Sequence, residues 1–250
     1  KYRGSSHGTN EYPTMIDERG LSVMPISALG LDYPVVKERV STGIERLDAM
    51  LAGKGYYKGS SILVSGTAGT GKSSIAAAFA DGVCSRGERC LYFSFEEAPA
   101  QIVRNMASIG MDLSRWASKG LLKFHSARST LYGLEQHLVV IHKLVNEFQP
   151  TAVVMDPITN LTSVGDMEDI KSMLTRVIDF LKGNVITTLF TSLTEGGLAL
   201  ERTDVGISSL MDTWLLLQAV ESAGERNRIL YILKSRGMAH SNQMREFLLT

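Results

Sequence analysis

The sequence is poor in cysteine and carries no surplus of charge of either sign. Cys84 and Cys90 are its two cysteines in 250 residues, and their spacing fits neither a common zinc pattern nor a disulfide framework. The 26 Lys and Arg residues balance 26 Asp and Glu residues, so the basic surplus typical of proteins that coat nucleic acids is missing. We therefore expect reduced, half-buried thiols and no nucleic-acid partner.

Long apolar runs are also missing. No stretch of about 18 uncharged apolar residues occurs, so we expect no membrane-spanning helix. Residues 1–4, Lys-Tyr-Arg-Gly, do not resemble the start of a signal peptide. A hydrophobic fraction of 44% over 250 residues is nevertheless enough for one substantial core, and a soluble cytoplasmic protein is expected.

Short apolar runs alternate with segments of helical periodicity from Ser41 onward. Apolar runs typical of strands occupy residues 61–65, 90–95, 121–124, 151–155 and 185–190, and helical periodicity occupies residues 73–86, 98–108, 131–148 and 166–181. Two late runs, 212–218 and 228–234, flank Gly224 and predict an antiparallel hairpin. The order predicts an α/β fold of the RecA-like P-loop NTPase type, with a mostly parallel sheet flanked by helices and an antiparallel edge hairpin.

One glycine-rich segment matches the phosphate-binding pattern G-x-x-x-x-G-K-[ST] completely. In such a loop, backbone N–H groups surround phosphate oxygens, the lysine bridges the β- and γ-phosphates, and the following hydroxyl binds Mg²⁺. A chance Gly-rich turn is the alternative, but a strand-like run precedes the segment and a helix-like run follows it. We expect ATP and Mg²⁺ here, bound through Gly66, Thr67, Ala68, Gly69, Thr70, Gly71, Lys72, Ser73 and Ser74.

Three carboxylates follow predicted strands, where a doubly wound sheet places its ligand crevice. Asp156 ends one strand and is expected to bind the water shell of Mg²⁺, the alternative being an ordinary turn residue before Pro157. Glu96 and Glu97 follow another strand and suit a general base beside the γ-phosphate, with Glu96 also near the metal. Their alternative is a solvated helix start, where acids are favoured.

Four segments together resemble the KaiC family of clock ATPases and autokinases over essentially the whole chain. They are Ser41-Thr-Gly-Ile-Glu-Arg-Leu-Asp, the glycine-rich loop, Phe95-Glu-Glu, and K-x-R-G-x-x-H at Lys234 to His240. Residues 1–7 repeat the last pattern, and KaiC proteins carry two tandem RecA-like domains. The resemblance therefore implies the tail of an upstream copy in residues 1–16, a linker in 17–40, and an ATPase/autokinase domain, similar to the C-terminal one, in 41–250.

The resemblance also implies an assembly and a modification. It implies a homo-hexamer with ATP between subunits and KaiB-like partner proteins. It further implies that a neighbour contributes Arg228, Lys234, Ser235, Arg236, Met238 and His240 to each nucleotide. Lys234 and Arg236 forming surface ion pairs is the alternative. Ser208 and Ser209 stand at the phosphoacceptor pair, with Thr203 five residues before it, unless these serines simply begin a strand.

Three functions compete on these observations. The first is a hexameric ATPase with Ser/Thr autokinase activity, the second a RecA-like DNA-dependent motor or recombinase, and the third a nucleotide-gated scaffold. The neutral charge argues against the motor. The Glu96–Glu97 pair argues against the scaffold, because a scaffold needs no general base.

Overall fold

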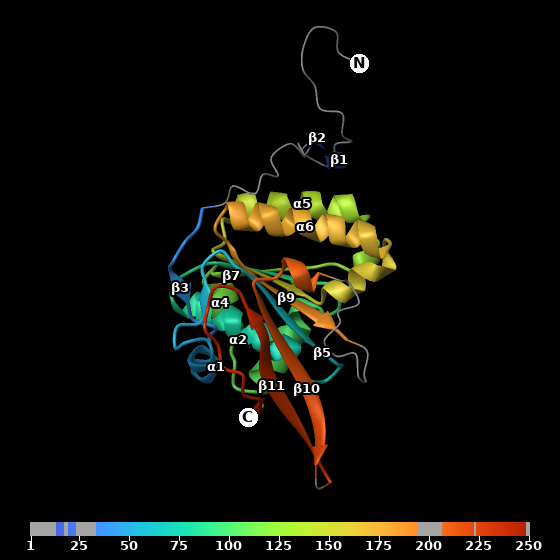
Figure 1. Ribbon diagram of the computed structural model, residues 1–250. Helices are drawn as coiled ribbons and strands as arrows, with labels where there is room; N and C mark the ends of the chain where they lie inside the picture. Colours follow the sequence, from blue (N-terminus) through green and yellow to red (C-terminus); the bar gives the residue numbers. More distant parts are fainter. Residues whose placement is uncertain (1–13, 18–19, 24–33, 195–206, 223, 249–250) are drawn as a thin grey trace.

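The computed structural model describes residues 14–17, 20–23, 34–194, 207–222 and 224–248 (Figure 1). Its strands are β1 (Thr14–Asp17), β2 (Gly20–Val23), β3 (Arg39–Val40), β4 (Tyr56–Tyr57), β5 (Ser61–Gly66), β6 (Cys90–Ser94), β7 (Leu122–Ser126), β8 (Ala152–Asp156), β9 (Thr187–Leu193), β10 (Thr213–Ser222), β11 (Glu225–Ser235) and β12 (Arg245–Glu246). Its α-helices are α1 (Glu45–Met50), α2 (Lys72–Ser85), α3 (Pro99–Ala107), α4 (Ser114–Ser118), α5 (Leu134–Phe148) and α6 (Met167–Gly183).

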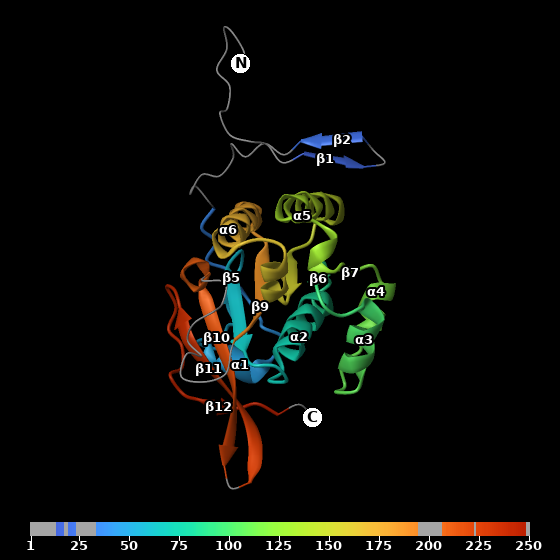
Figure 2. The ribbon, with the colours of Figure 1, turned by 90° about the vertical axis from the view of Figure 1, so that its right-hand side faces the viewer.

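An eight-stranded sheet organises the molecule, in the order β12-β11-β10-β5-β9-β8-β6-β7. Every neighbouring pair from β10 to β7 is parallel, whereas β11 and β12 are antiparallel to their neighbours. The β10–β11 hairpin extends beyond the rest of the sheet (Figure 2). The predicted mostly parallel sheet with an antiparallel edge hairpin is thereby confirmed.

Two apolar cores form because consecutive strand residues face opposite sides of the sheet. In β5, Ile62 and Val64 pack with α2, while Leu63 belongs to the core beneath α5 and α6. Figures 1 and 2 show α5 and α6 side by side on that second face. Because both faces of the sheet are covered, a ligand site is expected at the carboxyl ends of the parallel strands.

Some local details differ from the sequence expectations. The helix expected over 131–148 begins only at Leu134, because Ser129–Leu131 form a 3₁₀ helix and Gly133 donates its N–H to Gln136 Oε1 at 3.3 Å. The short helices α1 and α4 were not expected. Near the start of the chain, β1 and β2 pair as an antiparallel hairpin.

The remaining compositional expectations concern the thiols and the membrane. Cys84 and Cys90 carry free thiols and are fully buried rather than half-buried. Cys84 on α2 and Cys90 on β6 both lie in the apolar core between α2 and the sheet. Burial raises the pKa of both thiols well above that of an exposed cysteine. Within the described ranges, no helix is long and apolar enough to cross a membrane.

Candidate functional site

The glycine-rich segment forms the turn between β5 and α2. Gly66 permits the close approach of β10, because a Cβ at this position would lie 2.3 Å from the Leu217 carbonyl oxygen. Gly71 precedes α2 with φ of 95°, a left-handed conformation that favours glycine. The 14-residue helix α2 then directs its N-terminus toward the turn, which is the geometry that binds phosphate.

Lys72 occupies the interior of this loop. Its ammonium donates to the carbonyl oxygens of Gly66 at 2.9 Å and Thr67 at 2.7 Å. Burial lowers the pKa of Lys72 to about 8, against the opposing effect of the Asp156 and Glu96 carboxylates. The structure therefore brings the Asp156 and Glu96 carboxylates within electrostatic reach of Lys72.

Asp156 ends β8 and is buried, with 7% of its surface exposed. Tyr92 donates its hydroxyl hydrogen bond to Asp156 Oδ2 at 2.7 Å, and the Thr191 hydroxyl donates to Asp156 Oδ1. Burial, together with Asp156, raises the pKa of Tyr92, so the phenol stays a donor. Two hydroxyls thus orient the carboxylate, and neither donor was expected from the sequence.

Glu96 and Glu97 differ in their surroundings. Both follow β6, which is in register with β8, and Phe95 N donates to Asp156 O at 2.9 Å. Glu97 is half-buried, and its Oε2 accepts from Asn105 Nδ2 at 3.2 Å. Glu96 is exposed. The arrangement leaves Glu96 as the carboxylate open to a reacting group and gives Glu97 a structural partner on α3.

The oxygen donors at this edge suit Mg²⁺. Ser73 lies at the start of α2, Asp156 ends β8 and Glu96 follows β6. Among the described residues, no three His, Cys, Asp or Glu side chains gather into a closed metal cage. Mg²⁺ in nucleotide sites typically takes one or two carboxylates together with phosphate oxygens and water, so this donor set fits it.

The residues expected to reach a neighbour's nucleotide, on β11 and just after it, contact different parts of their own chain. Arg228 Nε donates to the Gly69 carbonyl at 3.1 Å, which places this side chain on the glycine-rich loop. Ser235 is buried, with its hydroxyl 2.8 Å from that of Thr213. His240 Nδ1 lies 3.2 Å from the carbonyl oxygen of Met238, whose sulfur contacts Arg39. Within the part of the chain that the structure describes, Arg228 is thus the member of this set that contacts the phosphate loop.

Lys234 and Arg236 contact the candidate acceptor segment instead. Lys234 Nζ donates to the Ser208 carbonyl, and Arg236 Nη2 donates to the Ser209 carbonyl at 2.5 Å. The two serines lie in the 3₁₀ helix η4 (Ser208–Leu210), and β10 begins only at Thr213. The alternative that these serines simply begin a strand is therefore wrong, because they form the 3₁₀ turn themselves and β10 starts four residues after Ser209. Thr203 lies outside the described residues.

Comparison with known proteins agrees with the motifs and the fold. The family model described as "ATPase: KaiC" matches residues 40–250. The chain is 56% identical to circadian clock protein KaiC2 of Synechocystis sp., an alignment covering 100% of the chain and 44% of the relative. It is 36% identical to circadian clock oscillator protein KaiC of Synechococcus elongatus, covering 100% of the chain and 48% of the relative. The chain spans about half the length of these curated relatives. Its ATPase domain belongs to the KaiC family.

Proposed function

We propose that the protein is a hexameric, Mg·ATP-dependent ATPase that also phosphorylates its own Ser208 and Ser209 across the subunit interface. The observation that carries the proposal is the convergence of Lys72, Asp156 and Glu96 at the carboxyl ends of β5, β8 and β6. The protein would act in the cytoplasm as a clock-type or clock-derived regulator with KaiB-like partner proteins. Residues 1–16 would be the tail of an upstream RecA-like copy, residues 17–40 a linker, and residues 41–250 the ATPase/autokinase domain.

The chemistry follows from the roles of these groups. The loop N–H groups and Lys72 bind the phosphates, and Mg²⁺, when bound through Ser73 and Asp156, offsets their charge. Glu96 accepts the proton of a water or serine hydroxyl as its oxygen bonds to the γ-phosphorus. The bond from that phosphorus to the β–γ bridging oxygen breaks, and ADP leaves. Water as the acceptor gives phosphate, whereas a serine gives a phosphoserine.

The position of the acceptor turn supports transfer between subunits. The Leu210 carbonyl accepts from Ser61 Oγ at 3.2 Å, and Asp212 N donates to Ser61 O at 2.9 Å. Ser61 begins β5, and the phosphate loop follows Gly66 at its other end. A strand rises about 3.3 Å per residue, so the two ends lie about 17 Å apart. A phosphate in the chain's own loop is therefore far from its own acceptors.

Intact-mass measurement and phosphopeptide mapping after incubation with Mg·ATP test the acceptor assignment. We expect mass gains of about 80 Da per phosphate, located on Ser208 and Ser209. The double variant Ser208→Ala/Ser209→Ala should lose them while its ATP hydrolysis persists. Phosphate at an equal level in the double variant would refute the acceptor assignment and leave the ATPase assignment standing.

Two substitutions separate nucleotide binding from chemistry. Lys72→Ala should abolish nucleotide binding, because it removes the cation inside the loop. Glu96→Gln should bind nucleotide normally but lose about 100-fold or more of its phosphoryl transfer, because it removes the base and keeps the loop intact. Equilibrium titration with a fluorescent ATP analogue and single-turnover assays measure the two effects. Loss of binding in both variants would show that this division of roles is wrong.

A further inference from the structure

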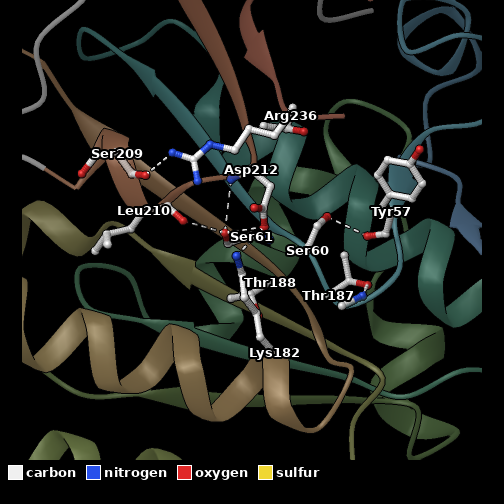
Figure 3. A network of polar contacts seen from close by, with 12 residues as sticks. Tyr57, Ser60, Ser61, Lys182, Thr187, Thr188, Ser209, Leu210, Asp212 and Arg236 are labelled. Carbon is white, nitrogen blue, oxygen red and sulfur yellow. Dashed lines mark hydrogen bonds and ion pairs between the residues drawn. The ribbon is translucent and has the colours of Figure 1, made fainter. Parts of the chain in front are cut away.

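Three consecutive backbone carbonyls of the acceptor turn each accept a hydrogen bond from a side chain. Ser208 O accepts from Lys234 Nζ, Ser209 O from Arg236 Nη2, and Leu210 O from Ser61 Oγ. Lys234 lies on β11, Arg236 directly follows that strand, and Ser61 begins β5. Figure 3 shows Arg236 and Ser61 reaching the turn from different sides. We call Ser61, Lys234 and Arg236 the carbonyl clamp.

Asp212 positions the β5 side of this clamp. Its Oδ2 accepts from Ser61 N at 2.8 Å and lies 2.9 Å from Ser61 Oγ. The single hydroxyl proton of Ser61 is therefore shared between Asp212 and the Leu210 carbonyl. The backbone of Asp212 also bonds to the first residue of β5 and to the residue after β11, since its N–H donates to Ser61 O and its carbonyl accepts from Arg236 N at 2.8 Å.

Lys182, near the end of α6, completes the arrangement. Its Nζ lies 2.7 Å from Asp212 Oδ2, with only 20% and 24% of the two side chains exposed. Figure 3 shows Lys182 reaching Asp212 from the helix side while Arg236 approaches the turn from the other side. A half-enclosed pair with additional hydrogen bonds is more ordered than an exposed ion pair.

The charge balance around the turn depends on Asp212. Burial lowers the pKa of Lys234, as do Arg236 and Lys182, whereas Asp212 opposes them. Removing the carboxylate charge would leave these three cations repelling one another. Their side chains would then compete for other anions and carbonyls, and the turn would lose its fixed backbone.

We propose that Asp212, held by Lys182, is a positioning residue for phosphoryl acceptance. Through Ser61 and the carbonyl clamp it fixes the backbone of η4, so that the hydroxyls of Ser208 and Ser209 are presented in one arrangement to an incoming γ-phosphate. This inference rests on the proposed autokinase function. Misplacing a reacting group by about 1 Å can cost about 100-fold in rate, so an unfastened turn should be a poor acceptor. Hydrolysis, in which water is the acceptor, does not depend on the turn.

The test compares three variants with the wild type in the same Mg·ATP incubation. Asp212→Asn removes the charge, Lys182→Met removes the ion pair, and Lys182→Arg keeps it. Arg176→Met is the matched control, because Arg176 also lies on α6 and pairs with Glu135 at 2.9 Å, away from the turn. Phosphopeptide mass spectrometry follows Ser208 and Ser209 separately, and phosphate release measures hydrolysis.

We expect Asp212→Asn and Lys182→Met to slow phosphorylation about 10- to 100-fold and to change the Ser208:Ser209 ratio, with hydrolysis within about twofold of wild type. Lys182→Arg and Arg176→Met should match wild type. Wild-type rates and ratio in Lys182→Met would overturn the inference while the autokinase function survives. If Asp212→Asn does not fold, Lys182→Met decides alone. A wild type that hydrolyses ATP but gains no phosphate at either serine overturns the autokinase proposal and this inference together.

Discussion

At the residue scale, the contacts of Glu96, Glu97 and Lys72 indicate a different role for each of these charged side chains. Glu96 and Glu97 are adjacent in the sequence, yet Glu97 accepts a hydrogen bond from Asn105 while Glu96 is exposed on the side of Lys72. Lys72 is a buried cation whose partners are two carbonyl oxygens of its own loop.

The lowered pKa of Lys72 makes nucleotide affinity depend on pH. Since that pKa is about 8 in the free chain, Lys72 is protonated at pH 7, and binding requires no proton uptake there. Above pH 8 the bound state holds a proton that the free state lacks, so affinity should fall about tenfold per pH unit. Titration with a fluorescent ATP analogue between pH 6.5 and 9.5 measures this dependence.

Lys72→Arg is the control for that titration, because a guanidinium remains protonated throughout this range. If the arginine variant binds, its affinity should stay constant from pH 7 to pH 9.5. A wild-type affinity that is equally constant would contradict a lowered pKa at Lys72.

At the scale of elements, the sequence predicted what depends on local pattern and missed what depends on long-range contact. Short apolar runs located the strands, and the glycine-rich pattern located the loop before α2. The helices α1 and α4 span only six and five residues, too short for a periodic signal. Ser61 and Asp212 are 151 residues apart, so no local pattern could reveal that they meet.

The N-terminus of α6 offers a test of element stability. Asp166 Oδ1 accepts from the N–H groups of Glu168 at 3.0 Å and Asp169 at 2.9 Å, so it caps the helix. Asp166→Ala should lower the free energy of unfolding by about 1 kcal/mol, because it leaves these donors without a protein acceptor. Urea unfolding monitored by circular dichroism measures the change.

Asp166→Asn separates capping from charge in the same experiment, because asparagine caps about as well as aspartate. It should retain most of the wild-type stability. An equal loss in both variants would assign the effect to the charge of Asp166 at the positive end of the helix.

At the scale of the whole molecule, the phosphate loop and the acceptor turn stand at opposite ends of β5, and the hairpin residue Arg228 meets the loop of its own chain. A single copy therefore separates the two halves of the proposed transfer reaction. Only an assembly in which one copy's turn meets another copy's loop would reunite them.

We accordingly expect ATP to drive ring formation. Light scattering in the presence of a nonhydrolysable ATP analogue should report a hexamer, and removal of the nucleotide should lower the mass. Lys72→Ala, which should not bind nucleotide, is the control and should remain small under both conditions. A wild type that stays monomeric at micromolar concentration in saturating nucleotide would refute the proposed assembly.

The length of β5 has a consequence for mixtures of defective copies. If phosphoryl transfer runs only between copies, a Glu96→Gln subunit, which still binds nucleotide, remains a competent acceptor in a ring, and a subunit without Ser208 and Ser209 remains a competent donor. The two defects should therefore complement each other in mixed rings although neither variant is phosphorylated alone. In genetic terms, the two mutations would show intersubunit complementation, because donor and acceptor would belong to different molecules.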